Sequence, residues 1–172
     1  IYAIRRGRSA QGMVPVSMVL GDVMSQLSEL TANGGKTVPG LSTGLSAVDM
    51  KINGMNKSDL LLLAARPGMG KTSMALNVAL SAARESGKTV AIFSLEMSKE
   101  QLVTRLIASE GLVENQRLIT GNLRESDWQR IAEAASSLSH MDIRIDDNPL
   151  LTVADMNAKC RRLDNLGLVV ID

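Results

Sequence analysis

The stretch Ala65–Thr72, with the sequence ARPGMGKT, carries residue types suited to binding a polyphosphate. Gly68 and Gly70 lie just ahead of Lys71, and glycines lack the Cβ atom that would keep the backbone away from a phosphate. A helix that opens at Lys71 has first N–H groups without helical partners and a dipole that favours an anion. Lys71 would then reach the terminal phosphates, and the Thr72 hydroxyl would be a ligand of Mg²⁺.

One position of this turn departs from the usual pattern, which begins with Gly where this chain has Ala65. The alternative is an ordinary strand-to-helix turn that holds Gly-Lys-Thr by chance. The context favours phosphate binding, because Leu60–Leu63 predicts a strand buried on both faces and the apolar residues 74–83 predict a packed helix. The predicted nucleotide-binding residues are Arg66, Pro67, Gly68, Met69, Gly70, Lys71, Thr72 and Ser73.

Strands and helices alternate along the rest of the chain. Apolar stretches at Thr89–Leu95, residues 143–145 and residues 168–171 predict three more strands. Helical stripes separate them, and capping boxes are expected at Ser98, Ser126 and Thr152. This order predicts an α/β fold in which helices flank a parallel sheet. Right-handed crossovers place the carboxyl ends of all strands at one edge, where ligands bind in such sheets.

Two carboxylates follow strands at that edge. Glu96 comes after the Thr89–Leu95 strand, and Asp172 follows the run LVVI. Hydrolysis of a nucleotide needs a carboxylate that positions or deprotonates the attacking water, which is the role expected for Glu96. Asp172, together with Thr72, is expected to serve the metal. The alternatives are that Glu96 only supports the next helix through its charge and that Asp172 only forms a turn.

The amino-terminal part of the chain predicts a separate segment. An apolar stripe over 16–30 indicates an amphipathic helix, which Asn33-Gly34-Gly35 ends. We place the boundary so that residues 1–36 form a linker segment and residues 37–172 form part of a nucleotide-binding domain. The stripe must be buried against either its own domain or a neighbouring subunit, and periodicity does not choose between them.

The composition excludes several classes of function. A net charge of +1 gives no general attraction to nucleic acid or anionic membrane, so any DNA contact must be local. No apolar run approaches a membrane span, and the amino terminus carries no signal-peptide pattern, so we expect no membrane association and a cytoplasmic location. The single cysteine, Cys160, lies on an apolar helix face and is predicted to pack in the core.

Taken together, ARPGMGKT, FSLEMS (residues 93–98) and LVVID (residues 168–172) resemble the DnaB family of replicative DNA helicases. PGLSTGLSAVD (residues 39–49) and RLIASEG (residues 105–111) are also similar to that family. The resemblance covers essentially the whole chain, from the family's linker into its RecA-like ATPase domain. It implies that Lys71 and Thr72 are the phosphate and metal residues, Glu96 the catalytic glutamate and Asp172 the metal-site aspartate.

The resemblance also implies a function and partners. The expected protein is a ring-shaped homo-hexamer that uses ATP and Mg²⁺ to translocate on single-stranded DNA and unwind a fork, together with primase and a helicase loader. Of the two alternatives for the amphipathic helix, the resemblance favours a contact with the adjacent subunit. The alternatives are another RecA-like ATPase, of the recombinase or clock type, and a non-catalytic oligomerisation module.

The family's DNA-contacting loops and its trans-acting basic residues come later than LVVID, so we expect the 172 residues to be an incomplete domain. In RecA-like sheets another strand lies between the Leu60–Leu63 strand and the LVVID strand, and two strand edges would be unpaired without it. The stretch alone is expected to bind nucleotide weakly and to hydrolyse little, because a trans-acting cation commonly supplies ~10³ or more in rate.

Overall fold

The computed structural model describes residues 13–32 and 40–172. Helix α1 (Val16–Ala32) belongs to one unit and residues 40–172 form another, so each is described by itself. The helix predicted over residues 16–30 is confirmed. Its predicted end at Asn33-Gly34-Gly35 and the boundary after residue 36 lie outside the described residues. Among the described helices, none combines the length and the apolar character needed to cross a bilayer.

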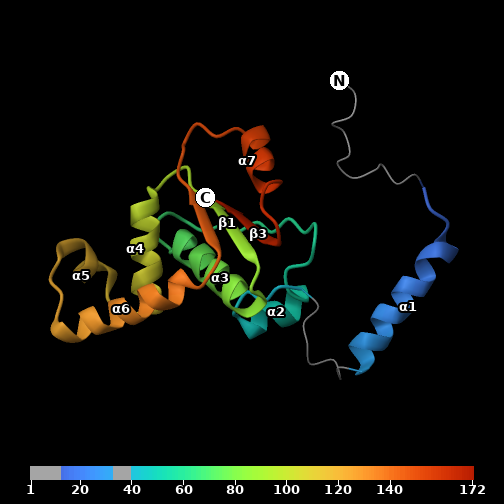
Figure 1. Cartoon of the computed structure of the whole chain (residues 1–172), viewed down its shortest axis with the longest axis horizontal. Helices are drawn as coiled ribbons and strands as arrows, with labels where there is room; N and C mark the ends of the chain where they lie inside the picture. The colour runs from blue at the N-terminus through green and yellow to red at the C-terminus, as the bar shows by residue number, and fades with distance from the viewer. Residues whose placement is uncertain (1–12, 33–39) are drawn as a thin grey trace. The chain divides into compact units, whose positions relative to one another are not determined.

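The second unit alternates helices with strands, as the sequence predicts, and Figure 1 labels all of these elements except β2. In chain order they are α2 (Ser46–Ile52), α3 (Lys71–Ser86), β1 (Thr89–Phe93), α4 (Lys99–Glu110), α5 (Asn115–Thr120), α6 (Glu125–Ser139), β2 (Ile143–Asp146), α7 (Val153–Cys160) and β3 (Leu166–Ile171).

The strands form a parallel sheet in the order β2-β1-β3, which confirms the predicted α/β architecture. The central strand pairs on both sides, with Val90 opposite Ile143 of β2 and Leu168 of β3. β1 ends at Phe93, two residues earlier than predicted. The chain after β1 therefore leaves the sheet before Glu96 and forms a turn at the carboxyl edge.

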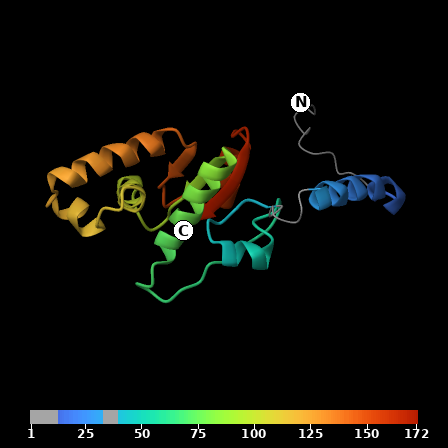
Figure 2. The ribbon, with the colours of Figure 1, turned by 90° about the horizontal axis from the view of Figure 1, so that it is seen from below.

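Helices cover both faces of β1, which is buried along its whole length. Because side chains alternate between the two faces of a strand, Val90 and Ile92 pack with the apolar residues of α3, whereas Phe93 packs with Met156 of α7. Figure 2 shows α3 lying along the sheet. Cys160 packs against the cluster of Ala91, Phe93 and Met156, so its predicted place in the core is confirmed.

The prediction of a buried strand at Leu60–Leu63 is wrong for the described residues. The segment forms neither a helix nor a strand, its backbone pairs with no described strand, and β3 remains an edge of the sheet. Leu60 is 85% exposed and Leu62 is 89% exposed. The physical reason is the missing neighbour: a run of leucines becomes a buried strand only where adjacent strands complete its ladder and helices cover both faces.

Two of the predicted capping boxes are confirmed, at Ser98 with Gln101 and at Thr152 with Asp155. The third, at Ser126, is wrong, because α6 begins at Glu125, two residues earlier than a cap at Ser126 requires, and Arg124 is the cap residue. The carboxylate of Asp127 accepts the Arg124 N–H at 3.0 Å and pairs with Arg117 at 3.3 Å. The Asp127 carboxylate thus caps the first turn of α6 and is itself paired with Arg117.

Candidate functional site

The turn before α3 has the backbone shape of a phosphate-binding loop. Gly68 and Gly70 have φ values of +78° and +88°, in the left-handed region that favours glycine. The N–H of Met69 donates to Arg66 O at 3.2 Å and closes the turn. The first helical bond of α3 runs from Met74 N to Gly70 O at 2.9 Å. The N–H groups of the first turn of α3 therefore have no helical acceptor and are available to an anion.

Asp172 joins this turn to the end of β3. Its carboxylate forms an ion pair with Lys71, and its Oδ2 accepts a hydrogen bond from Thr72 Oγ1 at 2.6 Å. Burial raises the pKa of Asp172, but the hydrogen bonds from Lys71 and Thr72 outweigh it, so the pKa lies below its ordinary value of 3.8. The same contact, with a smaller contribution from the charge of Glu96, raises the pKa of Lys71. Both groups are therefore charged at neutral pH.

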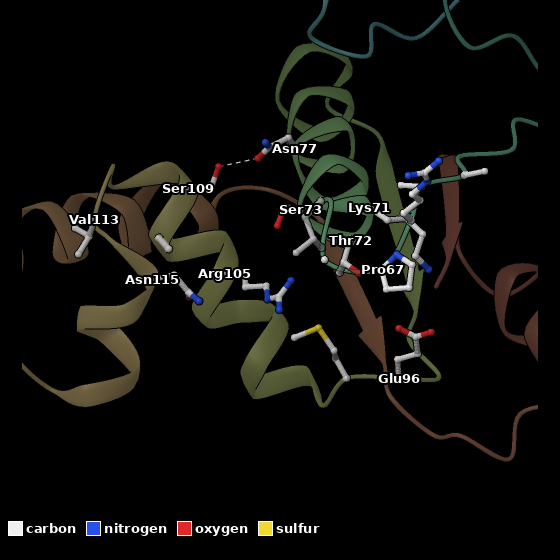
Figure 3. Close-up of a pocket in the computed structure, with 18 residues that line it drawn as sticks. Pro67, Lys71, Thr72, Ser73, Asn77, Glu96, Arg105, Ser109, Val113 and Asn115 are labelled. Carbon is white, nitrogen blue, oxygen red and sulfur yellow. Dashed lines mark hydrogen bonds between the residues drawn. The ribbon is translucent and has the colours of Figure 1, made fainter.

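A cavity of about 1090 Å³ opens beside these residues, between the turn, α4 and the start of α5 (Figure 3). Glu96 lines it from the turn after β1, on the side that faces Pro67 and Lys71. Its carboxylate has neither a hydrogen bond nor an ion pair to any described residue. The volume is slightly above the ~300–1,000 Å³ typical of small-molecule and cofactor sites, so the cavity is large enough for a nucleotide.

Nearly all the predicted site residues lie together around this cavity. The lining includes Arg66, Pro67, Gly68, Gly70, Lys71, Thr72, Ser73 and Glu96, and Asp172 contacts two of them. Met69 is the exception, because its side chain is exposed and lies outside the lining, while its N–H is used within the turn. Its predicted place in the nucleotide-binding site stays a prediction, which concerns the backbone of Met69 and not its exposed side chain.

The structure adds residues to which the sequence analysis gave no role in the site. Arg105 of α4 lines the cavity and reaches toward the start of α3 (Figure 3), where its charge also lowers the pKa of Asp172. The sequence signal was a basic residue next to the buried Leu106 in an otherwise apolar stripe. Further along the cavity, Ser109 donates to Asn77 at 2.7 Å and links α4 to α3. The buried Oδ1 of Asn115 has no hydrogen-bond partner.

The donor set fits a magnesium nucleotide. The described residues contain no cluster of three or more acidic, histidine or cysteine side chains that would hold a metal alone. Mg²⁺ does not need one, because it commonly binds through one or two carboxylates, waters and the phosphates of a substrate. Thr72 and Asp172 supply hard oxygen donors, and the free N–H groups of α3 suit the phosphates.

Comparison with known proteins shows which family has these features. The family model for the DnaB-like helicase C terminal domain matches residues 40–172. The replicative DNA helicase DnaB of Geobacillus stearothermophilus is 45% identical over 147 residues, covering 84% of this chain and 32% of that protein. The replicative DNA helicase DnaC of Bacillus subtilis is 46% identical over 138 residues, covering 78% of this chain and 30% of that protein.

Solved structures give the same result. The ATPase domain of G40P superimposes with a TM-score of 0.78 at 25% identity, covering 89% of this chain and 56% of that chain. A DnaB-like replicative helicase, described with its interactions with primase, has a TM-score of 0.77 at 26% identity, covering 94% of this chain and 39% of that one. The chain spans about a third of the length of these two curated relatives. It belongs to the DnaB-like helicase C-terminal domain family.

Proposed function

We propose that this chain is part of the ATP-driven motor of a replicative DNA helicase. The observation that carries the proposal is the meeting of Lys71 and Thr72 with Asp172 at the mouth of a cavity that Glu96 also lines. The reaction is hydrolysis of ATP, with the γ-phosphate bound at Lys71. Membership of the DnaB-like helicase family supports helicase activity over the activities of other RecA-like ATPases, such as recombinases.

The backbone of the glycine turn holds the phosphates. The positive φ values of Gly68 and Gly70 keep the loop open. The first N–H groups of α3, at the positive end of the helix dipole, point at the bound anion. Lys71 adds a positive charge close to the γ-phosphate. Asp172 pairs with Lys71, so a phosphate bound at Lys71 would compete with the Asp172 carboxylate for this cation.

Thr72 and Asp172 would hold a Mg²⁺ ion, which would supply positive charge against the negative charge of the transferring group. Thr72 would contribute its hydroxyl oxygen, and Asp172 its carboxylate, directly or through water. Asp172 keeps its negative charge at neutral pH, because its pKa is lowered.

Glu96 orients the attacking water and accepts its proton. A general base must lie within hydrogen-bond reach of the proton that it takes, and a free carboxylate on the cavity wall meets that requirement once substrate fills the site. Glu96 is exposed to the cavity and is not used by any ion pair with a described residue. Arg105, on the opposite wall, adds positive charge near the metal site.

The assembly and partners belong to the same proposal. We propose a homo-hexamer on single-stranded DNA that works with primase and a loader, in which the apolar stripe of α1 packs on the adjacent subunit. The amphipathic character of α1 and the primase interactions described for the related helicase support it. The net charge of +1 implies that DNA binding depends on local basic residues.

The test is unwinding of a forked duplex by the full-length protein. We expect ATP- and Mg²⁺-dependent strand displacement, which Lys71→Ala abolishes because the γ-phosphate loses its cation. Strand pairing without displacement from a fork would instead identify a recombinase. Displacement that continues in the Lys71→Ala protein would overturn the proposal.

A further inference from the structure

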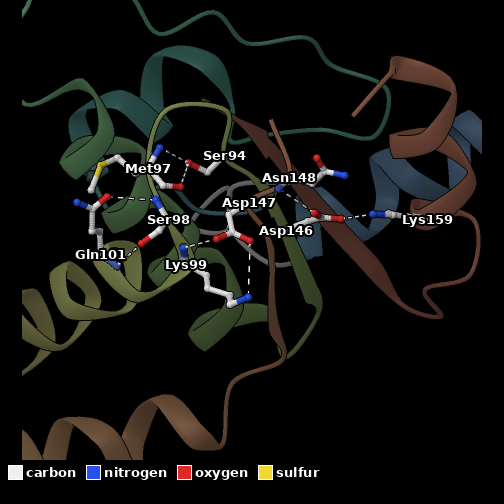
Figure 4. A network of polar contacts seen from close by, with 9 residues as sticks. All are labelled: Ser94, Met97, Ser98, Lys99, Gln101, Asp146, Asp147, Asn148 and Lys159. Carbon is white, nitrogen blue, oxygen red and sulfur yellow. Dashed lines mark hydrogen bonds and ion pairs between the residues drawn. The ribbon is translucent and has the colours of Figure 1, made fainter. Parts of the chain in front are cut away.

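The turn that carries Glu96 is fixed by contacts that do not involve Glu96 itself. It runs from Ser94 to Ser98, between the end of β1 and the start of α4. Since the Glu96 carboxylate has no partner among the described residues, the direction in which it points is set by the backbone of this turn. Figure 4 shows the polar contacts that surround the turn.

The beginning of the turn is held by hydrogen bonds to the ends of both neighbouring strands and by hydrogen bonds within the turn. The N–H of Ser94 donates to Asp146 O at the end of β2, at 2.9 Å, and the N–H of Leu95 donates to Asp172 O at the end of β3, at 2.7 Å. The Ser94 hydroxyl donates to Met97 O at 2.8 Å and accepts from Met97 N at 3.1 Å. Ser94 is only 1% exposed, so its own end of this closed loop is shielded from water.

The end of the turn is tied to β2 by a single side chain. Asp147, which follows β2, accepts the N–H of Lys99 at 3.0 Å, and its other oxygen lies 3.9 Å from Lys99 Nζ. Lys99 is the first residue of α4, so the carboxylate also interacts favourably with the positive end of that helix. Asp147 thus links the end of β2 to the helix start that immediately follows the Glu96 turn, where the Ser98–Gln101 capping box also acts.

We infer that Ser94 and Asp147 are positioning residues for Glu96, holding the two ends of its turn so that the carboxylate faces the γ-phosphate. The inference rests on the proposed function, because it assumes that Glu96 orients the attacking water. Small displacements of a reacting group are costly, and one of about 1 Å can reduce turnover by about 10²-fold. Loss of either contact should therefore act on turnover and not on nucleotide affinity.

The chain offers matched variants. Asp147→Ala removes the acceptor for the Lys99 N–H, whereas Asp147→Asn keeps an acceptor oxygen there. Asp146→Ala is the control, since the neighbouring carboxylate pairs with Lys159 and accepts the Asn148 N–H but makes no side-chain contact with the turn. Ser94→Ala removes the two hydrogen bonds between the Ser94 hydroxyl and the backbone of Met97. The two Asp147 variants keep the inference testable even where a change at the buried Ser94 prevents folding.

The experiment measures ATP turnover and ATP affinity in the full-length protein. We expect Asp147→Ala and Ser94→Ala to lower kcat about tenfold or more with the Kd for ATP unchanged within about threefold. Asp147→Asn should keep most of the activity and Asp146→Ala all of it. In a Glu96→Gln background, Asp147→Ala should cause no further loss, because the group that it positions is already absent.

Different results overturn different claims. If Glu96→Gln abolishes turnover but Asp147→Ala retains it, the positioning inference fails and the proposed function stands. The inference also fails if Asp147→Ala weakens ATP binding as much as turnover, if Asp146→Ala is equally damaging, or if the losses from Glu96→Gln and Asp147→Ala add. If Glu96→Gln retains wild-type turnover, the proposed role of Glu96 fails and the inference fails with it.

Discussion

The hydroxyl of Thr72 donates a hydrogen bond to Asp172 Oδ2 at 2.6 Å, although 100 positions separate the two residues in the chain. The contact brings the start of α3 to the end of β3 and places the two proposed metal-site oxygens side by side. It follows from the parallel sheet, because every strand ends at the same edge as the glycine turn.

Substitution of Asp172 tests the metal site. Asp172→Asn keeps the size of the side chain but removes the charge that would bind Mg²⁺. We expect the gain in ATP affinity on adding Mg²⁺ to fall about tenfold or more, equivalent to about 1.4 kcal/mol, with metal-free ATP binding retained. The measurement is an ATP titration with and without Mg²⁺. Asp142→Asn, at the opposite end of β2, is the control, and an unchanged Mg²⁺ gain in Asp172→Asn would contradict the metal role.

The Lys71–Asp172 ion pair predicts a plateau in the pH dependence of stability. The pKa of Asp172 is below 3.8, so its stabilisation is present above pH 3.8 and is lost as the pH falls through the lowered pKa. The pKa of Lys71 is above 10.5, so its stabilisation is present below pH 10.5 and is lost as the pH rises through the raised pKa. Denaturant unfolding of wild type and Asp172→Asn should therefore differ by a constant free energy between about pH 5 and 9. A difference that varies within this range would contradict the assignment.

Alanine substitutions at Gly68 and Gly70 should affect both stability and ATP binding, whereas the same substitution at Gly87 should affect stability alone. Gly68, Gly70 and Gly87 all have positive φ, and an added Cβ at any of them would meet no atom within 4 Å. Replacement by alanine should therefore cost about 1 kcal/mol of unfolding free energy at each position, through backbone strain alone. Only Gly68→Ala and Gly70→Ala should also weaken ATP binding, because Gly87 ends α3 away from the cavity. Equal ATP affinity in all three variants would argue against the phosphate-binding turn.

Asp49 is predicted to stabilise the segment ahead of α3. Its buried carboxylate accepts hydrogen bonds from Thr43 N at 2.8 Å, Thr43 Oγ1 at 2.6 Å and Ser42 Oγ at 2.8 Å. Burial raises the pKa of Asp49, but these three donors outweigh it, and the net shift is downward from 3.8. Asp49→Ala leaves buried donors unpaired and should lower the unfolding free energy by about 2 to 3 kcal/mol at pH 7.

The control for Asp49 is Asp59→Ala, an exposed carboxylate that accepts one N–H, from Asn56 at 2.9 Å. Its loss should cost less than about 1 kcal/mol. Because the folded pKa of Asp49 is lowered, its contribution is present above pH 3.8 and is lost as the pH falls through that lowered pKa. Equal destabilisation by the two variants at pH 7 would contradict the prediction.

The unpaired leucines predict a pattern of hydrogen exchange in the 172-residue chain. Residues 60–63 have no strand partner among the described residues, so their amides should exchange quickly. The amides of Val90–Phe93 lie in the central strand and should be strongly protected. Mass spectrometry of exchanged peptides makes the comparison. Strong protection at residues 60–63 would mean that a partner for this segment exists in solution.

Sequence patterns with local causes gave the correct elements. The glycine turn, the capping boxes at Ser98 and Thr152 and the apolar strands depend on residues close in the chain, and the handedness of crossovers then brought Asp172 to Lys71. Features that depend on distant neighbours were not predictable. Leu60–Leu63 lacks a ladder partner among the described residues, and Asp127 caps α6 while it is paired with Arg117 of another helix. Arg105 was not identified because periodicity alone does not show which cavity a helix face borders.

The most direct test of the central claim is ATP binding and turnover by Glu96→Gln in the full-length protein. Glutamine keeps the size of the side chain but does not accept a proton. We predict that the Kd for ATP stays within about threefold of wild type while kcat falls by about 10²- to 10⁴-fold, the range for loss of a general base. A Glu96→Gln protein that hydrolyses ATP at the wild-type rate would contradict the account.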